Sequence, residues 1–118
     1  MIVRFIKPDQ LSGTAKLTVH KTGKLGFSKG AMELVNTQKN RFVRFGFDEQ
    51  DQLLLEALPD AAENSFPVLK AGDYDYINAK ALLEQLAIDY TGPDTTIFDL
   101  KRLAEKGLFK LSERIIKK

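Results

Sequence analysis

Few residues in this sequence could carry catalytic or metal chemistry. The only histidine, His20, lies on the polar side of an expected strand, a position more typical of a surface residue than of a general base. Asp73 and Asp75 alternate so that they share one face of a strand, as paired acids or a metal site would require. Two carboxylates without further ligands are nevertheless typical of a solvated face. We therefore predict a non-enzymatic protein with no catalytic residue, no metal site and no cofactor.

Other chemical motifs are missing as well. The sequence contains no cysteine, which removes disulfides, thiolate metal sites and cysteine nucleophiles together. It has no glycine motif of the P-loop or dinucleotide-binding kind. No apolar run approaches the roughly 20 residues that span a bilayer. The absence of cysteine fits a reducing compartment, so we expect a cytoplasmic protein without a membrane partner.

Basic residues in the first part of the chain are the best candidates for binding an anionic partner. Residues 1–47 hold nine Lys or Arg against two Asp or Glu, residues 48–99 hold two against twelve, and residues 100–118 hold seven against two. Such asymmetry can mark a nucleic-acid-binding face, although opposite blocks can also pair within a monomer or across a dimer. The candidate DNA-binding residues are Lys21, Lys24, Lys29, Arg41 and Arg44, whose charges would neutralise phosphates.

Aromatic residues in the expected strands could instead form a platform on which single-stranded bases stack. At strand periodicity such residues more often belong to a core, and Phe42 is the one best placed to be exposed. The full set is Phe27, Phe42, Phe45, Phe47, Tyr74 and Tyr76.

A hairpin sequence that occurs twice, 49 residues apart, is expected to position these side chains. Its glycines supply the positive φ of a tight turn, and its apolar and aromatic residues alternate so that they point inward. The aligned pairs are Val19 and Val68, Lys21 and Lys70, Gly23 and Gly72, Leu25 and Tyr74, and Phe27 and Tyr76. A residue suited to cap a helix follows each copy: Ser28 in the first and Asn78, one place later, in the second.

Each hairpin is followed by a helix and a second pair of strands. The first helix is expected to end at Asn36, because Asn tolerates the left-handed conformation of a helix terminus. Residues 101–111 have helical propensity, but Phe109 and Leu111 alternate, so we predict a hairpin that turns at residues 105–107. Each copy then has the order β-β-α-β-β.

The predicted fold is a β-rich α+β single domain over residues 1–118. It consists of two tandem β-β-α-β-β units that form one pseudo-dimer, the first over residues 15–58 and the second over residues 66–115. Residues 1–6 alternate loosely and are expected to add an edge strand.

This pattern resembles the AbrB/MazE family of swapped-hairpin transition-state regulators and antitoxins. The first unit carries the resemblance at Gly23-Lys24-Leu25, Phe27-Ser28-Lys29, Val35-Asn36-Thr37 and Asn40-Arg41-Phe42-Val43. In that family two chains interlock their hairpins and present paired basic faces to DNA. The second unit has Asp73 and Asn78 at the positions of the basic pair Lys24 and Lys29. The resemblance therefore implies an intramolecular pseudo-dimer with one basic half.

The resemblance and the charge distribution together favour a DNA-binding or transcription-regulatory module whose partner is duplex DNA. Symmetric recognition of a palindrome would need two chains, and thus a homodimer. The alternative is a protein-interaction module, an antitoxin-like scaffold whose acidic second unit or charged C-terminus engages a basic or toxin partner. One continuous positive face would favour nucleic acid, whereas charges that cancel across an interface would favour the protein partner.

Overall fold

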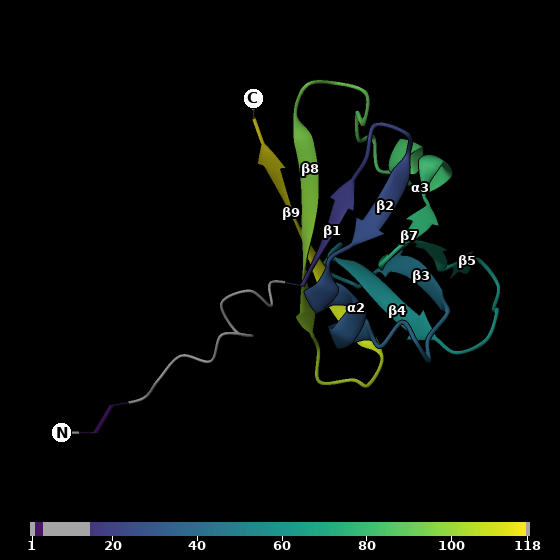
Figure 1. Ribbon diagram of the computed structural model, residues 1–118, viewed down its shortest axis with the longest axis vertical. Helices are drawn as coiled ribbons and strands as arrows, with labels where there is room; N and C mark the ends of the chain where they lie inside the picture. The colour runs from purple at the N-terminus through teal and green to yellow at the C-terminus, as the bar shows by residue number, and fades with distance from the viewer. Residues whose placement is uncertain (1, 4–14, 118) are drawn as a thin grey trace.

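The computed structural model describes residues 2–3 and 15–117 and shows a β-rich α+β fold (Figure 1). The edge strand expected over residues 1–6 falls mostly on residues outside those described. In chain order the elements are β1 (Lys16–Val19), β2 (Lys24–Phe27), α2 (Lys29–Val35), β3 (Phe42–Phe47), β4 (Leu53–Leu58), β5 (Phe66–Pro67), β6 (Leu69–Ala71), β7 (Tyr74–Asn78), α3 (Lys80–Gln85), β8 (Thr95–Arg102) and β9 (Leu108–Ile116).

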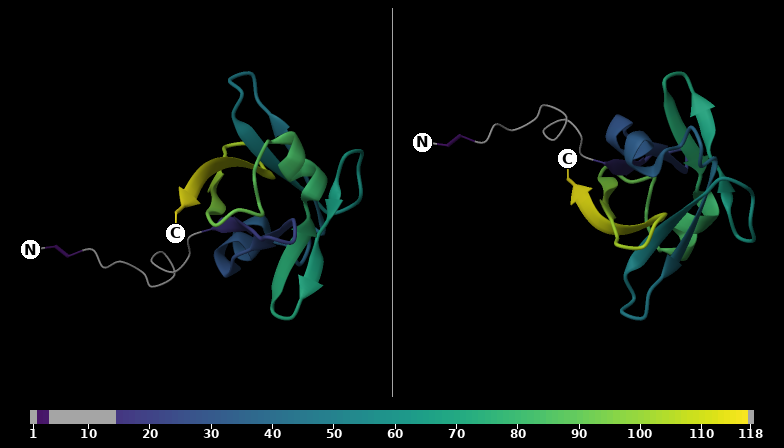
Figure 2. Two further views of the ribbon diagram at one scale, coloured as in Figure 1. Left: turned by 90° about the horizontal axis from the view of Figure 1, so that it is seen from above. Right: turned by 90° about the horizontal axis from the view of Figure 1, so that it is seen from below.

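The strands form one sheet in the order β5-β3-β4-β9-β8-β1-β2-β7-β6, and the paired strands are antiparallel. The two ends of this sheet, β5 and β6, are separated along the chain by Val68, whose N–H donates to the carbonyl of Arg41 over 2.8 Å. One short stretch of chain therefore reaches both ends. The sheet curls round on itself as a nearly closed barrel (Figure 2).

The β8–β9 hairpin lies between two strands from the first half of the chain. β8 pairs with β1, and β9 pairs with β4. The hairpin predicted to turn at residues 105–107 is confirmed, since β8 ends at Arg102 and β9 begins at Leu108. Pairing on both sides of the hairpin overrides the helical propensity of this segment, because strand formation depends on tertiary context.

The core fills the inside of the barrel with side chains from both halves of the chain. Leu17, Leu25, Leu55, Ile77 and Leu83 are the largest apolar side chains that are fully buried. Each contributes about 1.5–3 kcal/mol relative to an exposed position. The two helices add their own buried faces to the same cluster.

The first hairpin and its helix form as the sequence predicts. Gly23 has a φ of +85° in the β1–β2 turn, and a Cβ there would lie 2.7 Å from Cγ of Lys80. The Ser28 hydroxyl accepts from the Ala31 N–H over 3.1 Å and caps α2. Asn36 ends the helix in the left-handed conformation, with a φ of 58°.

The second hairpin is displaced by one residue from the predicted alignment. Asp75 is buried on β7, whereas Tyr74 is 46% exposed and Tyr76 is half-buried. The prediction that both tyrosines point inward is therefore wrong, because a shift of one residue turns every side chain of a strand to the other face. The predicted Asn78 cap is also wrong. The N-cap position of α3 is Ala79, which makes no capping side-chain hydrogen bond.

Candidate functional site

The three sequence-predicted lysines lie on the first hairpin and the helix that follows it. Lys21 lies in the exposed β1–β2 turn, and Lys29 is the exposed first residue of α2. The ammonium group of Lys24 on β2 lies 4.6 Å from the ring centroid of Tyr76 on β7. A cation–π contact of this kind contributes about 0.5–1 kcal/mol at an exposed site. The prediction that these lysines contact phosphate stays a prediction.

Arg41, the first predicted arginine, is bound to a buried carboxylate. Asp75 is 2% exposed, and its Oδ2 accepts from Thr37 Oγ1 over 2.5 Å and lies 3.4 Å from Nη1 of Arg41. The guanidinium also donates to the carbonyls of Thr37, over 2.8 Å, and Val68, over 2.6 Å. This network ties the segment after α2 to β7. The expectation that Asp73 and Asp75 form a solvated face is wrong for Asp75, although Asp73 is exposed.

Arg44, the second predicted arginine, is paired as well. Its Nε donates to Oε1 of Glu56 over 2.5 Å across the β3–β4 pair. Around the nearly closed sheet, β7 and the β5–β6 segment separate β3 from β2. Arg44 and Lys24 therefore belong to different strand pairs. The exposed His20 packs its ring over Gly26, where a Cβ would lie 2.6 Å from Nε2. The structure thus distributes the five predicted residues over a turn, a helix, two strands and the segment before β3.

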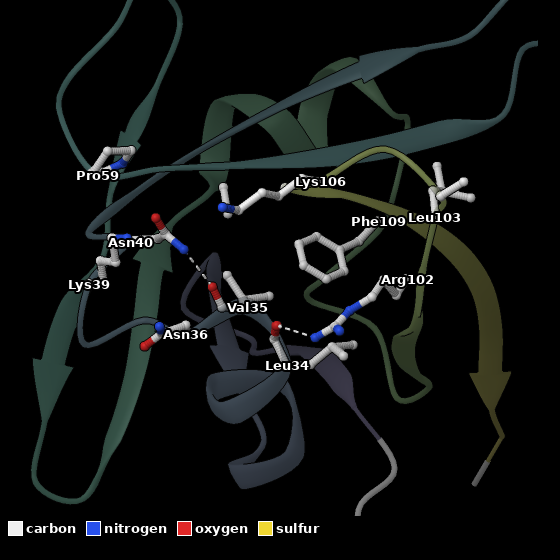
Figure 3. A pocket seen from close by; sticks show the side chains of 13 residues that line it. Leu34, Val35, Asn36, Lys39, Asn40, Pro59, Arg102, Leu103, Lys106 and Phe109 are labelled. Atoms are coloured by element: carbon white, nitrogen blue, oxygen red, sulfur yellow. Dashed lines mark hydrogen bonds between the residues drawn. The ribbon is translucent and has the colours of Figure 1, made fainter.

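A cleft of about 630 Å³ opens between the C-terminal end of α2 and the β8–β9 turn (Figure 3). Three cationic side chains line it, from Lys39, Arg102 and Lys106, and none of its lining residues is acidic. Its floor is apolar, with Val35 and Phe109 almost fully buried. Concave, mostly apolar walls with a few charged groups are typical of binding sites. Here all of the charged side chains in the lining are cationic.

The last turn of α2 fixes one wall of the cleft. Nδ2 of Asn40 donates to the carbonyl of Val35 over 2.8 Å, and Nη2 of Arg102 donates to the carbonyl of Leu34 over 3.5 Å (Figure 3). Both carbonyls belong to the group that a helix end leaves without intrahelical partners. Arg102 stands opposite Phe109 in the β8–β9 ladder. The hairpin therefore holds the Arg102 guanidinium against the end of α2.

Two further lysines lie on the β8–β9 hairpin without lining the cleft. Lys101 and Lys110 are directly opposite each other in the β8–β9 ladder, an arrangement that is destabilising for like charges. Among the described residues, no ion pair involves these lysines or the three cations of the cleft. Glu105 is the one acid between residues 101 and 110. We refer to the cleft lined by Lys39, Arg102 and Lys106 as the basic cleft.

Sequence reasoning missed the basic cleft, although one signal for it was present. The net charge of +5 over residues 100–118 marks the hairpin as basic. Lys39, however, follows α2 and reaches the hairpin only through the tertiary fold. The periodicity of each segment gives no information about which segments meet.

Comparison of the chain with protein-family models, with curated proteins and with solved structures found no match. No helix in the described part of the chain is long and apolar enough to cross a membrane. Residues 2–3 and 15–117 contain no group of three or more His, Asp or Glu side chains placed to hold a metal ion.

Proposed function

We propose that this chain is a non-enzymatic module that binds duplex DNA and that the basic cleft contacts the phosphates. One observation carries the proposal: three cations line one concavity and have no carboxylate partner within the described residues. They are Lys39, Arg102 and Lys106. Neutralisation of phosphates by such groups supplies essentially all of the affinity in non-specific DNA binding. Contacts to the phosphate backbone also fix the orientation of the protein on the duplex.

The aromatic side chains support a duplex rather than a single strand as the target. A single-strand binder needs exposed rings beside its basic groove. Phe109, in the floor of the cleft, is 4% exposed, and Phe42 is half-buried on β3. Phe47 is 61% exposed but does not line the cleft.

The two-unit, AbrB/MazE-like interpretation is part of this proposal. It is supported by the order of the elements, in which β1-β2-α2-β3-β4 is followed by β5 and β6, then β7-α3-β8-β9. Units over residues 15–58 and 66–115 would then make one pseudo-dimeric domain. The basic cleft would lie where α2 of the first unit meets β8–β9 of the second. A role in regulating transcription would follow from DNA binding by such a domain.

Replacing Lys39 and Lys106 together with alanine is expected to weaken binding to a mixed-sequence duplex. Each neutralised phosphate contributes a slope of about −0.9 to log K against log salt, so the double variant should flatten that slope by up to about 1.8. Arg102 is left in place because it also contacts the end of α2. The measurement is a binding titration at several salt concentrations.

The matched control is the double variant Lys21→Ala and Lys29→Ala, which removes the same charge from exposed positions on the first hairpin and helix. Its slope should change by less than about 0.9, the contribution of one contact. A larger change in the control than in the cleft variant would place the phosphate contacts on the first hairpin. Absence of binding even at low salt would overturn the proposal and favour the protein-interaction alternative.

A further inference from the structure

The C-terminal half of β9 has an open edge. On one side, Ser112–Ile116 pairs with β8 along its whole length, and the last pair is Ile116 opposite Thr95. On the other side, β4 pairs with β9 only through Leu108–Lys110, and β9 then runs on past β4 (Figure 1). Within residues 2–3 and 15–117, no strand pairs with this second side of Ser112–Ile116. Its backbone N–H and C=O groups therefore form a template for another strand.

The side chains of this edge are unusually apolar for an exposed position. Ile115 is 51% exposed and Ile116 is 44% exposed. Natural sheets usually protect an open edge with charges, prolines or bulges. Here the two isoleucines are placed between charged neighbours, Glu113 and Arg114 before them and Lys117 after them. The edge combines apolar area with charges of both signs.

We propose that a second copy of this chain pairs with this edge, antiparallel and centred on Ile115. Two residues directly opposite each other must point to the same face of the sheet, and side chains alternate between faces along each strand. The twofold axis must therefore pass a position where one residue lies opposite its own copy, rather than between two neighbouring residues. With the axis at Ile115, the two Ile115 side chains meet each other. Glu113 then stands opposite Lys117 of the partner subunit, and the symmetry creates this ion pair twice.

Neighbouring registers are disfavoured by charge. An axis at Arg114 would place the two Arg114 side chains opposite each other, and an axis at Glu113 would do the same for two carboxylates. Like charges directly opposite each other across strands are destabilising, whereas opposite charges contribute about 0.2–1 kcal/mol per pair. Of these three registers, the one centred on Ile115 is therefore the one in which apolar contact and charge complementarity coincide. This inference is independent of DNA binding.

A charge swap tests the proposed register. Glu113→Lys should raise the dimer dissociation constant about tenfold or more, because two attractive pairs become two repulsive ones. Lys117→Glu should have an effect of the same size. Combining the two substitutions restores opposite charges, so the double variant should return to within about threefold of the wild type. The measurement is sedimentation equilibrium over a range of protein concentrations.

Two results would overturn this inference. The first is a wild-type chain that stays monomeric at every concentration examined. The second is a dimer whose dissociation constant is unchanged by Glu113→Lys, since it would use another surface. All three variants alter exposed positions, and thermal unfolding of each variant would verify that the fold is intact.

Discussion

Replacing Arg41 with alanine is expected to lower the free energy of unfolding by about 3 kcal/mol, because it leaves a buried carboxylate without its main charge partner. The Asp75 side chain is 3% exposed and would keep the Thr37 hydroxyl as its close donor. Its other oxygen, Oδ1, has no hydrogen bond. Nζ of Lys70 lies 3.7 Å from Oδ1 on a side chain that is 69% exposed, so it offsets part of the loss. Chemical denaturation measures the effect.

Arg44→Ala is the matched control, since it also removes an arginine from an ion pair. Arg44 lies three residues after Arg41, but its ion pair is near the surface. The side chains of Arg44 and Glu56 are 42% and 33% exposed, so water screens their attraction. The expected loss is below about 1 kcal/mol. Adding Asp75→Asn to Arg41→Ala should recover part of the stability by removing the unpaired charge. Equal losses for the two arginine variants would contradict a structural role for the buried pair.

Truncation of Leu83 to alanine should cost about 3–5 kcal/mol, as expected for a fully buried leucine whose site cannot collapse completely. Leu83 lies on α3 with 0% exposure, in the same buried cluster as Leu25 and Ile77. The substitution leaves the backbone bond from its N–H to the carbonyl of Ala79 in place. The denaturation midpoint should therefore fall while the slope with denaturant stays unchanged.

Phe45→Ala is the comparison for Leu83→Ala, because Phe45 packs against the same buried cluster as a partly buried residue. In the structure Phe45 is half-buried and packs edge-to-face against Phe66, with ring centroids 5.7 Å apart. Its loss should be smaller than that of Leu83, although phenylalanine is the larger side chain, because solvent already reaches part of the ring. An equal or larger loss at Phe45 would mean that the centre of the core lies on β3 instead.

The sequence predicts well the parts of the fold that depend on local interactions. Gly23, Ser28 and Asn36 each act within a few residues, through a turn, a cap and a left-handed helix end. The second hairpin lacks such a signal, since Ala79 has no side chain that can cap α3. Asn78 was the nearest residue suited to that role, and the cap prediction is wrong by one position. Which side chains of β7 point into the core depends on how β7 pairs with β2. No local sequence pattern indicates that pairing.

The candidate site was less accessible to sequence reasoning because its charges depend on distant partners. Arg41 and Arg44 look like free cations in a basic stretch, yet each meets a carboxylate supplied by another strand. Lys39 and Arg102, by contrast, come from separate basic segments and meet at one cleft. Net charge therefore identifies the basic segments, but the tertiary fold decides which of their cations pair with carboxylates.

The placement of the β8–β9 hairpin has a consequence for how the protein folds. β1 and β4 each have an unpaired side until this hairpin inserts between them. The barrel therefore cannot close before residues 95–116 have left the ribosome. Closure depends on pairings between strands far apart in the sequence, which is a topology that folds slowly. During synthesis the nascent chain presents two open strand edges, and these make it vulnerable to aggregation until the β8–β9 hairpin is available to pair with them.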